Sequence, residues 1–73
     1  MTEAIKLLDV VALTEDVSQE KLRRGEVGTV VEVLRPDVFE VEFADGDGQT
    51  YAMATLRKDQ LMVLHYKPAR AAG

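Results

Sequence analysis

The sequence predicts a small all-β domain built as a five-stranded barrel, and three observations support that fold class. In Gly25–Val33, two glycines lead directly into a run of β-branched residues, whose stiff side chains suit a pleated sheet. Val38–Phe43 alternates apolar and charged residues with the period of a strand that buries one face. Asp45–Gly48 contains two successive Asp-Gly pairs, which are typical of a tight hairpin turn.

The chain before this region supplies a lead-in to the first strand and a long polar loop. Thr2–Leu8 could form one helical turn, but an extended lead-in is favoured because so short a helix is marginal without packing. Thr14–Arg24 is the longest polar segment and is predicted to be a loop. Within it, Ser18 is expected to cap a short turn that points Leu22 inward and ends at Gly25.

Five short strands are expected, with a single 3₁₀ turn at Arg57–Gln60 before the last one. Phe39, Val41 and Phe43 share one face of their strand, which we expect to be buried, and the two glutamates between them face solvent. The expected strands are Asp9–Leu13, Thr29–Leu34, Val38–Phe43, Gln49–Leu56 and Leu61–Leu64.

Length and composition limit the chain to one small domain. It has 73 residues, of which 47% are hydrophobic, so its core is small. We expect residues 1–64 to form the barrel and residues 65–73, which lack periodicity, to form a flexible tail. The chain has no cysteine, and its first residues match neither a signal peptide nor a membrane span. A reducing, cytoplasmic location is therefore expected. The net charge of −4 does not favour non-specific attraction to phosphate.

The order of these elements resembles that of an SH3-like barrel, and particular motifs resemble known families. Gly28-Thr29-Val30, with Val33 three residues further on, looks like the signature of KOW-type barrels, and Arg24–Val30 is similar to the barrel segment of nitrile hydratase β subunits. The strongest resemblance is to a bacterial family known as domain-of-unknown-function family 4926. It implies a small SH3-like barrel in a bacterial cytoplasm and no established activity. This resemblance covers residues 6–64 and is carried by Leu8–Leu13, Gly25–Val33, Glu40–Phe43 and Asp47-Gly48.

The resemblance to KOW-type barrels also implies that Val30 and Val33 both point inward. Strict alternation would put these two residues on opposite faces, so a bulge or sharp bend is expected in this strand. Gly28 precedes a strongly β-branched segment, and we expect it to have a positive φ or to lie in close contact with neighbouring backbone.

Three motifs that could carry chemistry have simpler structural interpretations. Asp45–Gly48 spaces two carboxylates like a calcium loop but lacks the further ligands, so a plain hairpin turn is favoured. Ser18–Lys21 has the Ser-x-x-Lys spacing of some serine hydrolases but lacks their large fold, so a solvated turn is favoured. His65 is the only histidine, and it has no second histidine for a metal site or a proton relay. We expect no catalytic, cofactor-binding or metal site.

The candidate partner-binding residues form one cluster in the polar loop: Lys21, Arg23, Arg24 and Glu26. Neighbouring acidic residues offset the positive field of this cluster, so a solvated surface is the favoured interpretation, ahead of an acidic protein partner and of nucleic acid.

An enzyme is the function class that the sequence supports least, because no nucleophile–base pair or phosphate-binding loop can be assembled and a filled barrel leaves no pocket. Two classes remain: a protein-binding module, such as an accessory or antitoxin-like subunit, and a KOW-like nucleic-acid-associated barrel. The net charge favours the first, with no membrane or small-molecule partner expected. Its partner would bind the loop Thr14–Gly25 and a strand edge, which is expected at Asp9–Leu13 or Leu61–Leu64 rather than at Val38–Phe43. A homodimer through such an edge is also possible.

Overall fold

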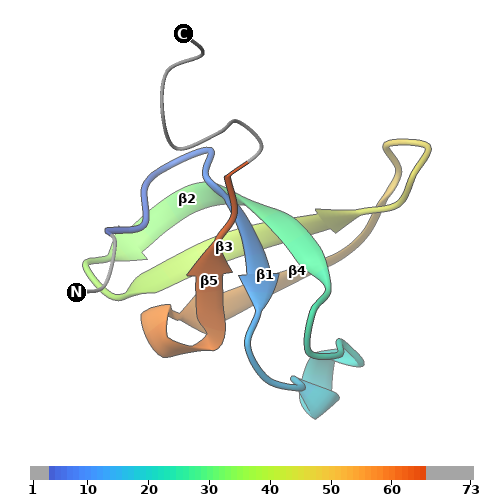
Figure 1. Ribbon diagram of the computed structural model, residues 1–73, viewed down its shortest axis with the longest axis horizontal. Coiled ribbons are helices and arrows are strands. Elements are labelled where there is room, and N and C mark those ends of the chain that lie inside the picture. The colour runs from blue at the N-terminus through green and yellow to red at the C-terminus, as the bar shows by residue number, and fades with distance from the viewer. Residues whose placement is uncertain (1–3, 66–73) are drawn as a thin grey trace, which may run out of the picture.

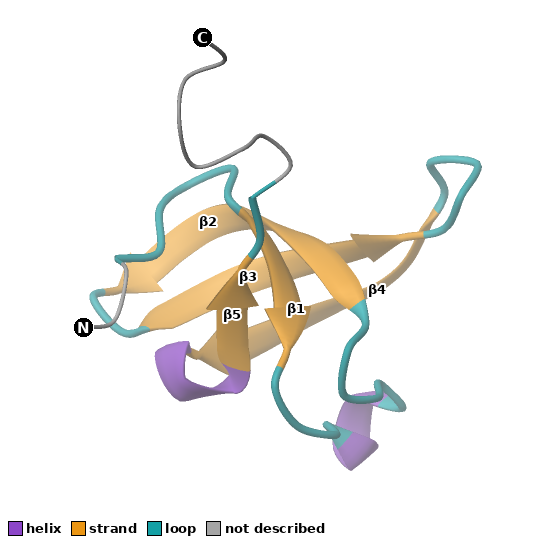
Figure 2. Cartoon of the chain, viewed as in Figure 1, coloured by secondary structure: helices purple, strands orange, loops and turns teal. Residues whose placement is uncertain are grey.

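The computed structural model describes residues 4–65 and confirms an all-β fold with five strands. Two 3₁₀ turns, purple in Figure 2, interrupt the strands, and the second of them directly precedes the last strand as expected. The elements are β1 (Val10–Leu13), η1 (Ser18–Glu20), β2 (Val27–Arg35), β3 (Val38–Ala44), β4 (Thr50–Arg57), η2 (Lys58–Gln60) and β5 (Leu61–Val63). The expected tail falls almost entirely on residues 66–73, outside the described residues.

All strands belong to one antiparallel sheet with the order β4-β3-β2-β1-β5. The strands β2, β3 and β4 form a meander, and β5 returns to pair with β1 at the other side of the sheet (Figure 1). The edge strands β4 and β5 do not pair with each other, so the sheet stays open and does not close into a barrel. Only the three-residue turn η2 joins these two strands, and loop residues pack on it: the Thr14 hydroxyl donates to the Asp59 carbonyl and the Gln60 amide donates to Glu15.

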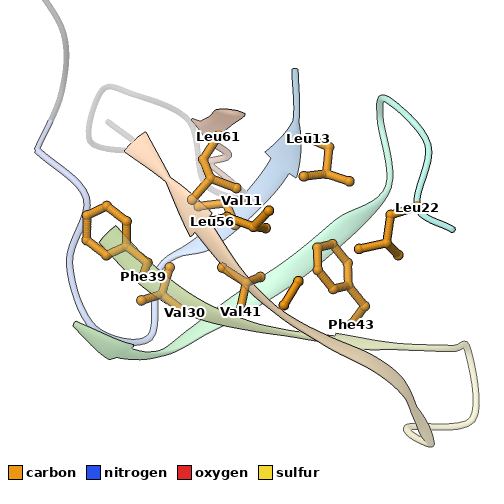
Figure 3. Close-up of a cluster of buried hydrophobic side chains, with 10 residues drawn as sticks. Val11, Leu13, Leu22, Val30, Phe39, Val41, Phe43, Leu56 and Leu61 are labelled. Carbon is orange, nitrogen blue, oxygen red and sulfur yellow. The ribbon is translucent and has the colours of Figure 1, made fainter. Parts of the chain in front are cut away.

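A single core lies inside the curled sheet, with the alternating side chains of β3 at its centre (Figure 3). Phe39, Val41 and Phe43 are each at most 1% exposed, as the period-2 pattern predicted. Leu22 reaches this core from the loop and is 2% exposed, which confirms its predicted inward position (Figure 3). The buried cluster consists of Val11, Leu13, Leu22, Val30, Phe39, Val41, Phe43, Ala54, Leu56 and Leu61.

The strand β2 contains the expected bulge, but only one of its two valines is buried. The register with β3 shifts between Val30 and Glu32, as a bulge requires. Val30 is fully buried, whereas Val33 is 45% exposed and its predicted burial is wrong. The reason is that the first strand and its lead-in bond to β2 only as far as Val30, so the second half of β2 has a neighbouring strand on one side only.

Gly28 is needed for a close approach and not for its backbone angle. Of the two predicted alternatives, a positive φ is not the one found. The predicted contact is confirmed, because a Cβ atom at this position would lie 2.7 Å from Val41 Cγ1 and 2.8 Å from the backbone oxygen of Glu42. A side chain there would push β2 away from β3.

The polar loop folds differently from the prediction in two respects. Ser18 begins the turn η1, but its side chain makes no capping hydrogen bond, and Val17 occupies the N-cap position. The turn ends at Lys21, which has a left-handed backbone with φ of 58°, so Gly25 is not the residue that stops it. A backbone bridge between Val17 and Leu22 closes the turn instead.

Candidate partner-binding surface

The basic cluster lies on the part of the loop that Leu22 fastens to the core. Lys21 and Arg23 flank this buried leucine, and both are exposed. Together with Asp16 and Ser18 they line a shallow hollow above it. The cluster is therefore held in place by the backbone, while its charged ends face solvent.

Acidic side chains shape the backbone of the same cluster. The Arg24 N–H donates to Asp16 Oδ1 at 2.8 Å, and the Arg23 N–H donates to Glu26 Oε2 at 2.6 Å. These two carboxylates reduce the positive potential of the loop. The structure thus brings Arg23, Arg24 and Glu26 together, but with the carboxylates serving the fold of the loop.

Glu26 has a structural role that sequence reasoning missed. Its second carboxylate oxygen accepts a hydrogen bond of 2.7 Å from the hydroxyl of Tyr51, which is 25 residues away in β4. The Tyr51 hydroxyl and then the Arg23 N–H hold the pKa of Glu26 below its ordinary value, and the same bond raises the pKa of Tyr51. Both oxygens of Glu26 are therefore used within the chain, and the bond ties the end of the loop to the start of β4.

The acidic hairpin turn uses its first carboxylate in the same way. Asp45 Oδ1 accepts the N–H groups of Asp47 at 2.9 Å and Gln49 at 3.0 Å, and Gly48 has a φ of 82°. This confirms the predicted hairpin turn, and the turn projects from the body of the molecule (Figure 1). Within residues 4–65, no group of three or more His, Asp or Glu side chains gathers into an arrangement that could hold a metal ion.

The longer free edge of the sheet is β4, which the sequence did not indicate as an edge. Lys58 N–H donates to the Asp37 carbonyl at 2.8 Å, so Ala52, Ala54 and Leu56 of β4 direct their backbone groups toward β3. By alternation, Met53 and Thr55 direct their N–H and C=O groups away from β3, toward the side of β4 where the sheet ends. Their side chains are also exposed. This edge can accept another strand.

The second free edge, β5, is much shorter. Leu64 N–H donates to the Val10 carbonyl at 2.8 Å, and by the same alternation Leu61 and Val63 point away from β1. The Leu61 N–H is already bonded to the Lys58 carbonyl. The expectation that Leu61–Leu64 forms an edge is correct, whereas β1 lies inside the sheet and the alternative edge at Asp9–Leu13 is wrong.

Carboxylates lie along the outer face of the sheet beside the β4 edge. Thr55 Oγ1 donates to Glu40 Oε1 at 2.7 Å, and Thr50 Oγ1 donates to Glu42 Oε2 at 2.5 Å. Both glutamates belong to β3, and the two threonine hydroxyls draw their carboxylates over β4. Glu32 of β2 lies opposite Glu40 on the same face. In the described part of the chain, none of these three glutamates forms an ion pair with a basic side chain.

Comparisons with known proteins give a family and no further relative. No curated protein and no solved structure matches the chain. Among residues 4–65, no helix has the length and apolar character needed to cross a membrane. A family model does match, over residues 7–63, and its description is a domain of unknown function, DUF4926. Since the match spans nearly all of the five-stranded fold, this chain belongs to the DUF4926 family.

Proposed function

We propose that this domain is a non-catalytic protein-binding module, an accessory subunit that takes an extended segment of another protein onto the edge of its sheet. The observation that carries the proposal is the β4 edge, eight residues long, with Met53 and Thr55 directing backbone groups outward. An extended segment that pairs there would satisfy these groups and continue the sheet. Met53 and Tyr51, which are 47% and 50% exposed, offer apolar contacts to such a segment.

The remaining surface is consistent with the same role. The inner face of the sheet carries the buried core, so its outer face, edges and loops are the surfaces that can meet a partner. The bond between Glu26 and Tyr51 places the end of the loop next to the start of β4. The same bond attaches the loop that carries Lys21, Arg23 and Arg24 to the strand whose outer edge the partner would pair with. The carboxylates of Asp16 and Glu26 against this loop favour a protein partner over nucleic acid.

The test uses a proline that blocks one edge without disturbing the sheet. The Met53 N–H points away from β3, so Met53→Pro removes an outward donor and leaves the β3–β4 ladder intact. Val63→Pro does the same to β5 and is the matched control, and Met53→Ala controls for the lost side chain. Each variant is first shown to be folded by its thermal melt, and is then used as bait in extract from the native cell.

The proposal expects a specific co-purifying protein that Met53→Pro loses and that Val63→Pro and Met53→Ala retain. Hydrogen exchange of the purified complex should show protection at the Met53 and Thr55 amides. Retention of every partner by Met53→Pro would contradict strand addition at β4. Submicromolar binding of generic RNA or DNA, abolished when Lys21, Arg23 and Arg24 are changed to alanine, would favour a nucleic-acid-associated domain instead.

A further inference from the structure

The charge beside the β4 edge restricts which strand the edge can take. A strand added to β4 would lie about 4.8 Å from it, and its alternate side chains would emerge on the same outer face as Met53 and Thr55. The carboxylates of Glu40 and Glu42 lie over β4 on that face, because threonine hydroxyls of β4 hold them there. They are thus one strand spacing from the added strand, within reach of a lysine or arginine side chain.

Neither of these carboxylates forms an ion pair with a basic side chain of the described residues 4–65. The basic side chain that ends β4, Arg57, is paired with Asp59 at 3.0 Å, and Lys6 is paired with Asp9, so neither cation forms an ion pair with this row. Glu32 and Glu40 are directly opposite each other, and like charges in that position destabilise a sheet. A basic strand on β4 would offset the negative charge of Glu40 and Glu42, whereas an acidic strand would add to it.

A second copy of the chain fits the same edge poorly. Antiparallel pairing of β4 with itself would satisfy the outward backbone groups of Met53 and Thr55. It would also place two further carboxylates, from the Glu40 and Glu42 side chains of the second copy, on the same outer face. Four carboxylates without cations would then border one interface, which electrostatic complementarity disfavours.

Resting on the proposed function, we infer that the segment accepted by β4 is basic, an extended strand with lysine or arginine at alternate positions on the outer face. Backbone hydrogen bonds to Met53 and Thr55 provide the binding, and the two carboxylates provide the selectivity. The glutamates discriminate among partners by their charge, and the threonines keep that charge at the edge.

Three blocked octapeptides test this inference on the intact protein. Each has valine at every second position, and the positions between carry lysine, threonine or glutamate. Binding is followed at low salt through the backbone amide signals of Met53 and Thr55. The lysine peptide should bind roughly fivefold or more tightly than the threonine peptide, since two exposed ion pairs are gained. The preference should decrease as salt is added.

Variants that remove carboxylate charges identify which glutamates cause the preference for the lysine peptide. The double variant of Glu40→Gln and Glu42→Gln keeps the hydrogen-bond acceptors for Thr55 and Thr50, and should bind the lysine and threonine peptides equally. Glu32→Gln is the matched control, because Glu32 lies on β2, two strands from the edge, and should keep most of the preference.

The outcomes separate this inference from the proposed function. Equal binding of the three peptides at Met53 and Thr55 would overturn the charge preference and leave strand addition standing. Failure of all three to bind would overturn the inference, while capture with Met53→Pro would still decide the proposed function. A concentration-dependent dimer in sedimentation, lost in Met53→Pro, would show that a second copy occupies the edge and would overturn the inference.

Discussion

The two edges of the sheet are built from the same chain and the same core, but they differ in how they are protected. The strand β5 has three residues, and the turn before it already uses the N–H of Leu61. The strand β4 has eight residues and contains neither proline nor lysine, the residues that commonly block an edge. Its pairing with β3 is irregular at one place, near its first residues, where the register shifts between Phe43 and Ala44. Shortness therefore protects the β5 edge, whereas the longer β4 edge lacks that protection.

The largest effect is expected from Phe43, whose side chain lies in the core to which both β4 and β5 contribute. Phe43 is fully buried, and it pairs with Gly28 of β2 and Ala52 of β4. Phe43→Ala should cost about 3–5 kcal/mol of unfolding free energy, which is comparable with the whole stability of so small a domain. Circular dichroism and amide exchange should show that the variant is largely unfolded at both edges. A variant that melts within a few degrees of the wild type would show that the core is not shared.

Proline substitutions at two adjacent positions of β4 should distinguish its outward side from the side that pairs with β3. Ala54 directs its N–H toward β3, so Ala54→Pro breaks a ladder bond and should cost about 2–4 kcal/mol. Met53→Pro, on the outward side, should cost less than about 1 kcal/mol. Urea titrations of the two variants measure this difference. Similar losses for both would mean that β4 is not free on its outer side.

Gly28 lies in the strand that connects the β1–β5 side of the sheet to the β3–β4 side. It pairs with Val11 of β1 and with Phe43 of β3, so it stands between the β5 side and the β4 side. Gly28→Val should destabilise by about 1–3 kcal/mol, because the new Cβ atom overlaps Val41 and the backbone of Glu42. Gly48→Ala is a useful contrast, since that position has open space and only a positive φ. If thermal melts find no loss for Gly28→Val, β2 and β3 are less closely packed than the structure has them.

The sequence predicted the elements that depend on local pattern and failed where neighbours decide. Alternation was enough to find the buried face of Phe39, Val41 and Phe43. The burial of Val33 depended on how far β1 extends along β2, which no local pattern encodes. The edge at β4 was missed because the order of strands in the sheet is set by the pairing of β5 with β1.

The candidate site shows the same division. The basic residues of the loop are evident in the sequence, and the structure finds them exposed where they were expected. The role of Glu26 was hidden because its partner, Tyr51, comes from a distant strand. Likewise, Glu40 and Glu42 read correctly as outer-face residues, but the threonines that hold their carboxylates belong to the next strand. Contacts between distant segments therefore define the part of the surface that alternation cannot locate.

The smallest expected effect tests the link between the loop and β4. Tyr51→Phe removes the hydrogen bond to Glu26 and should cost about 0.5–1 kcal/mol near neutral pH. The pKa of Glu26 lies below its ordinary 4.5 in the folded protein, so this stabilisation is present above that pH and decreases as pH falls through the lowered value. The pKa of Tyr51 is raised above 10.0, so the stabilisation is present below that pH and is lost as pH rises further.

The free-energy difference between wild type and Tyr51→Phe should therefore be largest in a plateau between about pH 5 and pH 9 and should shrink on both sides. Urea unfolding across that range measures it, and the carboxyl carbon shift of Glu26 should titrate at higher pH in the variant. The Arg23 N–H still bonds to Glu26 Oε2 in the variant, so the loop should keep its shape and only its attachment to β4 should weaken. A larger increase in amide exchange over the wild type at Ala52 of β4 than at Met62 of β5, both of which face a paired strand, would then place the loosened segment on the β4 side of the sheet. Equal increases at the two edges would show that the Glu26–Tyr51 bond does not hold the loop against the longer edge.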